Sequence, residues 1–314
     1  MNKVKNVVVV GTGLIAKFHI CALKEIEGVK IFGVCSRSKE RAEEFIKTLS
    51  LDETKAFDNL REALKDNDVS LLLVANESGA HFEAVKTAAE LKVPVLVEKP
   101  IGINVSEVKE MISLCEKAEV QLGCIFQTRW SEEYENLKRR IESGELGKIT
   151  FVRVDVPWWR DDEYYTKSSW HGTLKMDGGG ALINQAIHMV DWLVSLMPEI
   201  EDVKSFKATL VHPMEAEDTL SAILRFKGGA LGNIYATTAS FPGRPKRFEI
   251  TGSKGTIVLE DKSHGTNRPD QIPYTQHKKA IESFIKSIEN GDKYSINGYE
   301  ALKSIELIER IYNA

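Results

Sequence analysis

A glycine-rich turn near the N-terminus constrains the fold more than any other feature. Residues 11–16 read Gly-Thr-Gly-Leu-Ile-Ala, which fits G-x-G-x-x-A. The valine-rich run from Val4 to Val10 is typical of a parallel strand that is buried on both faces. Apolar residues then recur at steps of three and four over 14–27, which indicates a helix with one buried face. We predict a helix N-terminus that faces a pyrophosphate; the alternative is a turn that only packs strand on helix.

Strands and helices alternate over the first 122 residues. Further strands are predicted near 30–35, 70–74 and 95–97, and helices near 40–49, 79–91 and 106–118, with a short helix that Asp58 opens. Each return to a parallel strand requires a crossover element, so the alternation predicts a doubly wound parallel sheet. We expect residues 1–122 to form a dinucleotide-binding Rossmann domain of an α/β protein.

The end of the second predicted strand should contact the adenosine ribose, about 20 residues beyond the glycine turn. The sequence there is Ser36-Arg37-Ser38, without an acidic residue to bind a free 2′-hydroxyl. Arginine and serine side chains suit a 2′-phosphate, so NADP(H) is favoured as the cofactor, with NAD(H) as the alternative. A competing interpretation is that Arg37 covers the adenine whichever cofactor binds.

The pattern changes in residues 123–314, which we predict to form an α+β domain for substrate binding and oligomerisation. Short connections with turn signals separate the expected strands, so most neighbours should be antiparallel in an open sheet. The strands are expected near 148–156, 203–211, 218–226, 230–239, 247–251 and 255–259, and helices near 132–142, 277–290 and 297–312. One face of this sheet is not covered by helices, which predicts a homodimer or homotetramer through it.

Composition restricts the partners. Lys and Arg number 42 against 46 Asp and Glu, a net charge of -4, so no basic field attracts nucleic acid. No stretch reaches the ~18 uninterrupted apolar residues that a membrane helix needs, and the N-terminal apolar run is too short for an export signal. The four cysteines form no C-x-x-C pair and are expected to be reduced, without a metal site. We predict a cytoplasmic protein with a small-molecule partner.

Residues 93–100 read VPVLVEKP and place a charged pair at the end of an apolar strand. Ligands of open parallel sheets bind outside the carboxyl ends of the strands, so Lys99 is expected beside a bound nicotinamide. Pro100 follows and either bends the chain or forms a cis bond, which would aim the lysine. The alternative is an ordinary solvated pair at a strand exit.

Residues 177–191 read DGGGALINQAIHMVD, a triple glycine followed by a predicted helix. Asn184, His188 and Asp191 recur at four and three residues and would share one face. A lone histidine on a helix is often structural. Here it shares its face with polar groups after a segment that permits close backbone approach, so a functional role for His188 is favoured.

Jointly, these segments resemble the Gfo/Idh/MocA family of NAD(P)-dependent sugar and cyclitol oxidoreductases over nearly the whole chain. The segments are the glycine turn, NESGAH at 76–81, VEKP at 97–100, GELGKI at 144–149, GGGALINQAIHMVD at 178–191 and ITGSKGTIVLE at 250–260. The resemblance implies that Lys99 is the active-site lysine, that Pro100 is often cis and that His188 lies over the substrate carbon. Many members carry aspartate where this chain has Asn184, as in an Asp-His dyad. Asparagine here is similar to the pattern in nucleotide-sugar 3-dehydrogenases of the family.

The expected reaction is hydride transfer between a nicotinamide and a secondary alcohol or ketone of a sugar, sugar derivative or cyclitol. Lys99 would stabilise the oxygen charge, His188 would move the proton and Asn184 would hold a neighbouring hydroxyl. The predicted cofactor-binding residues are Gly11, Thr12, Gly13, Leu14, Ile15, Ser36, Arg37, Ser38, Ala75, Asn76, His81, Glu98, Lys99 and Pro100. The predicted substrate-binding residues are Lys99, Arg129, Trp158, Arg160, Tyr165, Trp170, Asn184 and His188. Two alternatives are a hydrolase or lyase that oxidises its substrate transiently and a cofactor-binding regulator without turnover.

Overall fold

A computed structural model describes residues 6–66, 68–261 and 273–314, so residues 4 and 5 of the first predicted strand lie outside it. The described residues divide into two compact units. Unit 1 lies within Met1–Gln127 and Pro273–Leu302, and unit 2 within Thr128–Ile272 and Lys303–Ala314.

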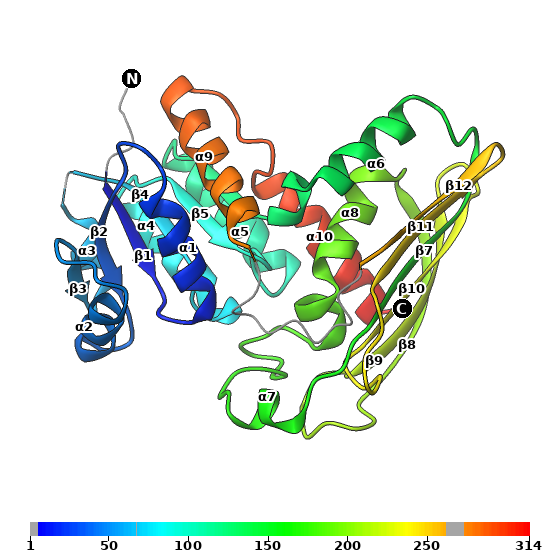
Figure 1. The fold of residues 1–314 in the computed structure, drawn as a ribbon, viewed down its shortest axis with the longest axis horizontal. Helices are drawn as coiled ribbons and strands as arrows, with labels where there is room; N and C mark the ends of the chain where they lie inside the picture. Colours follow the sequence, from blue (N-terminus) through cyan, green and yellow to red (C-terminus); the bar gives the residue numbers. More distant parts are fainter. Residues whose placement is uncertain (1–5, 67, 262–272) are drawn as a thin grey trace. The chain divides into compact units, whose positions relative to one another are not determined.

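Unit 1 contains a six-stranded parallel sheet in the order β3-β2-β1-β4-β5-β6 (Figure 1). This is the strand order of a dinucleotide-binding Rossmann fold. Val7 to Val10 of β1 are buried, as expected for a central strand covered on both faces. The strands are β1 (Asn6–Val10), β2 (Lys30–Cys35), β3 (Lys55–Phe57), β4 (Val69–Val74), β5 (Val95–Glu98) and β6 (Leu122–Ile125).

Helices cover both faces of this sheet because the crossovers from β1 to β2 and from β4 to β5 run in opposite directions along it. Helix α1 packs against α9, and α4 packs against α5. The main helices of unit 1 are α1 (Leu14–Lys24), α2 (Lys39–Thr48), α3 (Leu60–Leu64), α4 (His81–Glu90), α5 (Val105–Lys117) and α9 (Thr275–Asn290). The predicted α/β fold class is confirmed.

Two strands and one helix differ from the sequence-based expectation. The short strand β3 was not expected. Strand β6 was not expected either, and it crosses the predicted domain boundary at residue 122. Helix α9 was expected in the second domain, but it belongs to unit 1. Its Phe284 ring packs on Gly123, where a Cβ would meet the ring at 2.7 Å, and Cys124 N donates to Ile296 O. The residues that these contacts join are far apart in the sequence, so the periodicity of a local segment does not reveal them.

Unit 2 contains a mixed six-stranded sheet in the order β12-β11-β7-β10-β9-β8, in which β7 and β10 are parallel and the other neighbours antiparallel. The alternating burial of β9 shows that one face is packed and the other exposed. Helices α6 and α8 lie on one side of the sheet (Figure 1). The elements are α6 (Glu132–Glu142), β7 (Ile149–Pro157), α7 (Asp162–Thr166), α8 (Ile187–Leu196), β8 (Ile200–Ala208), β9 (Thr219–Phe226), β10 (Leu231–Thr237), β11 (Arg247–Gly252) and β12 (Gly255–Glu260). Helix α10 (Gly298–Tyr312) runs from unit 1 into unit 2.

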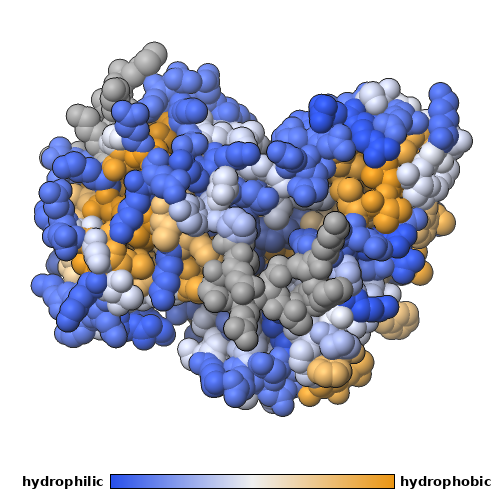
Figure 2. Space-filling view, in the orientation of Figure 1, coloured by the Kyte–Doolittle hydropathy of each residue, from blue (hydrophilic) through white to orange (hydrophobic). Residues whose placement is uncertain are grey.

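The open face of the unit 2 sheet carries exposed apolar side chains. Phe206 on β8 is 88% exposed, Ile223 on β9 62% and Leu231 on β10 46%. Figure 2 shows apolar residues (orange) reaching the surface in unit 2. Among the described helices, none combines the length and apolar character that a membrane span requires. Within the same residues, no cluster of three or more His, Cys, Asp or Glu side chains suits a metal ion.

Candidate active site

The turn between β1 and α1 is shaped by its two glycines. Gly11 has φ +112°, and a Cβ there would lie 2.3 Å from Ala75 O, so only glycine lets β1 and β4 end this close together. At Gly13 a Cβ would meet no described atom within 4 Å, which leaves room for a ligand. Gly13 is also the N-cap of α1 and has no side chain to cap it, so the first-turn amides remain available. This geometry fits a dinucleotide pyrophosphate beside Gly11, Thr12, Gly13, Leu14 and Ile15.

The predicted ribose-binding residues lie at the adjacent end of β2. The hydroxyls of Ser36 and Thr12 are 3.2 Å apart, so this end joins the glycine turn. Arg37 is 64% exposed at its side chain and its guanidinium lies 3.5 Å from a Glu77 carboxylate oxygen. Ser38 caps α2 and accepts a hydrogen bond from Arg41 N, so its hydroxyl is already engaged.

Lys99 follows β5 at the same carboxyl edge of the sheet, and its backbone is held by the preceding glutamate. Glu98 Oε2 accepts from Lys99 N at 3.0 Å, while Glu98 Oε1 accepts from His19 Nε2 at 2.7 Å. Burial opposes ionisation of Glu98, but the hydrogen bond with His19 and electrostatic interactions with His19, His277 and Lys99 outweigh it and lower the pKa of Glu98. The Lys99-Pro100 peptide bond is cis. Lys99 is half-buried, so the solvated-pair interpretation does not describe it.

His277 of α9 completes this buried group, and sequence patterns did not indicate it. Its ring lies 5.4 Å from that of His19 and is 1% exposed. Burial and the neighbouring His19 lower the pKa of His277 to about 4, despite the opposite effect of Glu98.

We expect His277→Phe to flatten the pH dependence of stability in mild acid. Between pH 6.5, its ordinary pKa, and about pH 4, His277 is protonated in the unfolded chain but neutral in the folded chain. The free energy of unfolding therefore decreases as the pH is lowered through this range. The difference amounts to about 3 kcal/mol between pH 7 and pH 4. Urea unfolding at several pH values measures it. The prediction is contradicted by an unchanged slope in the variant.

His81 is a buried residue that contacts the backbone of two segments at the carboxyl edge of the unit 1 sheet, one of which contains Ala75 and Asn76. His81 is 1% exposed, with Nδ1 2.9 Å from Pro100 O and Nε2 3.2 Å from Asn76 O. Burial lowers the pKa of His81 and favours its neutral form. The ring therefore ties the segment after β4 to the segment after β5. Its contacts are to backbone, whereas the sequence suggested a cofactor contact.

In unit 2, the segment after the triple glycine differs from the regular helix that the spacing predicted. Ala181–Gln185 form a π-helical turn, and α8 begins at Ile187. Asn184 and His188 are half-buried, whereas Asp191 is fully buried. Glu217 holds the turn by accepting from Gly180 N and Leu182 N, each at 3.0 Å. Burial raises the pKa of Glu217, to which Tyr312 also donates.

Several predicted substrate residues form one polar and aromatic cluster in unit 2. Arg160 Nη2 donates to Gln185 Oε1 at 2.8 Å, and the guanidinium lies 5.2 Å from the Trp158 ring. Gln185 donates to the Tyr164 hydroxyl, whose ring stacks on His171 at 4.2 Å. Trp170 packs on the same His171, with ring centroids 4.0 Å apart. Arg160 therefore contacts the segment that carries Asn184 directly, and Trp158 and Trp170 belong to the same cluster through Arg160 and His171.

Two other predicted substrate residues have strong internal partners. Arg129 donates to both carboxylate oxygens of Asp191, at 2.8 and 2.6 Å, and its side chain is 11% exposed. Tyr165 is 7% exposed and donates to Thr238 Oγ1 at 2.8 Å. The first contact positions α8 and the second positions α7, so they explain these residues without a ligand.

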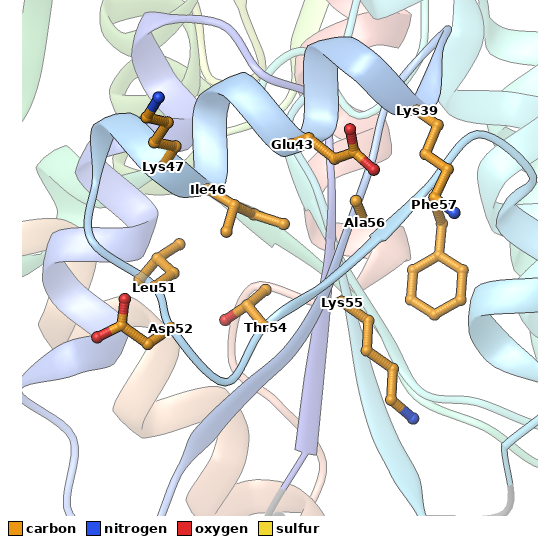
Figure 3. Close-up of a pocket in the computed structure, with 10 residues that line it drawn as sticks. All are labelled: Lys39, Glu43, Ile46, Lys47, Leu51, Asp52, Thr54, Lys55, Ala56 and Phe57. Carbon is orange, nitrogen blue, oxygen red and sulfur yellow. The ribbon is translucent and has the colours of Figure 1, made fainter.

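In unit 1, an open pocket of about 630 Å³ lies between α2 and β3 (Figure 3). Lys39, Lys47 and Lys55 line it together with Glu43 and Asp52. None of the predicted cofactor or catalytic residues lines it, so it does not mark the active site.

Family comparison agrees with both units. A model described as "Oxidoreductase family, NAD-binding Rossmann fold" matches residues 5–126, and one described as "GFO/IDH/MocA C-terminal domain" matches residues 134–258. The chain belongs to the GFO/IDH/MocA oxidoreductase family. The predicted family and the predicted oxidoreductase activity with a nicotinamide cofactor are confirmed.

Relatives of this GFO/IDH/MocA oxidoreductase align over most of its length. Myo-inositol 2-dehydrogenase of Thermotoga maritima is 28% identical, with 95% of each chain covered. The scyllo-inositol 2-dehydrogenase (NAD(+)) of Bacillus subtilis is 26% identical over 82% of this chain and 74% of its own. The WlbA dehydrogenase of Bordetella pertussis, solved with NADH and UDP-GlcNAcA, superposes with a TM-score of 0.90 at 29% identity, covering 98% of this chain and 95% of WlbA.

Proposed function

We propose that the protein is a dehydrogenase or reductase that interconverts a secondary alcohol and a ketone on a sugar derivative or cyclitol. The observation that carries this proposal is the carboxyl edge of the unit 1 sheet. There the glycine turn, with room beside Gly13 and uncapped helix amides, shares one edge with Lys99. A dinucleotide that binds along this edge supplies the hydride donor or acceptor.

Three side chains are proposed to act on the substrate. Lys99 donates to the substrate oxygen and stabilises the negative charge that develops on it. His188 takes the hydroxyl proton during oxidation and returns it during reduction. Asn184 binds a neighbouring hydroxyl. Lys99 belongs to unit 1, and His188 and Asn184 belong to unit 2.

The substrate is proposed to be a polyol ring, with a nucleotide sugar as the preferred class. Arg160 contacts Gln185 of the π-helical turn, Trp158 packs beside Arg160 and Trp170 beside His171, and indole faces pack well on sugar C–H surfaces. The Thermotoga maritima myo-inositol 2-dehydrogenase supports a polyol ring, and WlbA, solved with UDP-GlcNAcA, supports a nucleotide sugar; both are similar over nearly the whole chain.

A substrate panel tests the proposal. The purified protein is assayed at 340 nm with NAD⁺ and NADP⁺ against myo-inositol, scyllo-inositol, glucose, and UDP-GlcNAcA, with product analysis in parallel. Net cofactor reduction with at least one of these supports a dehydrogenase. Product formation without net reduction would identify a transient-redox hydrolase or lyase, and neither signal would favour a regulator.

For the cofactor, we propose a preference for NADP(H) that depends on Arg37. The guanidinium is exposed, and Arg37 directly follows Ser36, whose hydroxyl contacts that of Thr12 in the glycine turn. Glu77 lies 3.5 Å from it and holds it in place.

We expect Arg37→Asp to lower kcat/KM for NADP⁺ relative to NAD⁺ by about 10- to 100-fold, because a charged hydrogen bond to the 2′-phosphate is lost and a carboxylate can bind the 2′-hydroxyl. Initial rates with both cofactors measure this ratio. Arg41→Asp, four residues later in the first turn of α2, is the matched control. A variant that still prefers NADP⁺ refutes the assignment.

We also propose that the open face of the unit 2 sheet pairs with a second copy, forming a homodimer or a homotetramer. Phe206, Ile223 and Leu231 are exposed on adjacent parts of β8, β9 and β10. Contiguous exposed apolar area of this kind marks association surfaces. Sedimentation of the wild type and of Ile223→Lys tests it, and a wild-type monomer at all concentrations removes the proposal.

A further inference from the structure

A buried carboxylate of unit 2 contacts the proposed catalytic residue Asn184 and has no role in the scheme above. Asp177, the residue before the triple glycine, is 2% exposed. Asn184 Nδ2 donates to both of its oxygens, at 2.7 and 2.9 Å. Gly172 N donates to Asp177 Oδ2 at 2.9 Å, so the carboxylate is itself held in place.

The chemistry of this contact determines which way the Asn184 amide points. An ionised carboxylate only accepts hydrogen bonds, whereas an amide has a donor end and an acceptor end. The NH₂ end of Asn184 must therefore face Asp177, and the carbonyl end must face elsewhere. Consistently, Asn184 Oδ1 accepts from Gln185 Nε2 at 3.2 Å.

The surrounding groups reinforce this orientation. The same Gln185 amide nitrogen donates to the Tyr164 hydroxyl at 3.0 Å, and Gln185 Oε1 accepts from Arg160. Burial and the nearby charge of Asp177 raise the pKa of Tyr164 to about 12, so this hydroxyl keeps its proton. Each amide in the cluster thus has one permitted orientation.

We propose that Asp177 is a positioning residue that holds the Asn184 carbonyl oxygen toward the substrate and thereby selects a hydrogen-bond donor there. This inference rests on the proposed function, because it takes Asn184 as the group that binds the substrate. A free hydroxyl beside the reacting carbon satisfies the carbonyl oxygen. A substrate with an acceptor-only group at that place, such as a keto or methoxy oxygen, gives the Asn184 carbonyl oxygen no hydrogen-bond donor. Such a substrate binds less well.

Three variants test the orientation. In Asp177→Asn the Asn184 amide is free to turn over, and we expect kcat/KM to fall about 10- to 100-fold, as for the loss of a charged hydrogen bond. In Asn184→Asp two carboxylates meet and share a proton, so activity should fall as pH rises through the raised pKa of the pair.

The double variant, Asp177→Asn with Asn184→Asp, restores a carboxylate-amide pair with an acceptor oxygen at position 184. We expect it to recover activity to within about tenfold of wild type.

The measurements use UDP-GlcNAcA or myo-inositol, whichever the wild type oxidises, and Glu142→Gln at the exposed end of α6 as the control. A side-chain amide NMR signal of Asn184 that is shifted by the carboxylate in wild type and lost in Asp177→Asn supports the pairing without reference to turnover. Wild-type kcat/KM in a folded Asp177→Asn, or a double variant no better than either single one, overturns the inference. If His188→Ala and Asn184→Ala also keep full turnover, the proposed function fails instead.

Discussion

Lys99→Ala is expected to lower turnover by about 10²- to 10⁴-fold while NAD(P)H binding changes little. The side chain stabilises charge that develops on the substrate oxygen, so its removal affects the transition state more than the bound cofactor. Single-turnover absorbance at 340 nm and cofactor fluorescence titration measure the two effects separately.

Lys117→Ala is the matched control for this substitution. Lys117 is an exposed lysine at the end of α5 in the same unit, and its removal should leave both quantities unchanged. A Lys99→Ala enzyme with wild-type turnover would remove the redox role of this lysine. A parallel loss of turnover and cofactor affinity would show instead that Lys99 serves mainly to bind the dinucleotide.

The second large effect is expected from Gly11→Ala. The added Cβ would lie 2.3 Å from Ala75 O and 2.8 Å from Asn76 N, both backbone atoms of the segment that follows β4. Because Ala75 N also donates to Val10 O, this segment cannot withdraw without breaking the end of the sheet. We expect a loss of about 2–4 kcal/mol in the free energy of unfolding and severely weakened cofactor binding.

Gly28→Ala separates the steric clash from backbone strain. Gly28 has φ +77°, also in the left-handed region, but a Cβ there would meet no described atom within 4 Å. Its substitution should cost only about 1 kcal/mol. Chemical denaturation and fluorescence titration of both variants give the comparison, and equal effects at the two glycines would contradict the steric explanation.

Local patterns in the sequence determined most of the fold of unit 1. Residues 11–16 join a valine-rich strand to an amphipathic helix, and repetition of that alternation permits few arrangements other than a parallel sheet. The glycine turn, Lys99 and the Asn184-His188 segment were found in the same way, because each lies beside a strand end or a glycine run. These signals are local, so one sequence suffices to show them.

Tertiary contacts decided what local patterns could not. Helix α9 joins unit 1 through His277 and Phe284, although more than 140 residues separate it from Gly123. The spacing predicted that Asp191 shares a polar face with Asn184 and His188, but Asp191 is fully buried in an ion pair with Arg129. Similarly, the partner of Asn184 is Asp177, seven residues earlier across a glycine segment. The sequence by itself determined the α/β plan and the chemical types of the candidate groups, because hydrophobic periodicity and turn chemistry act over a few residues. Only the tertiary structure decided which of these groups pair with each other, because burial and hydrogen bonding depend on residues that meet through folding.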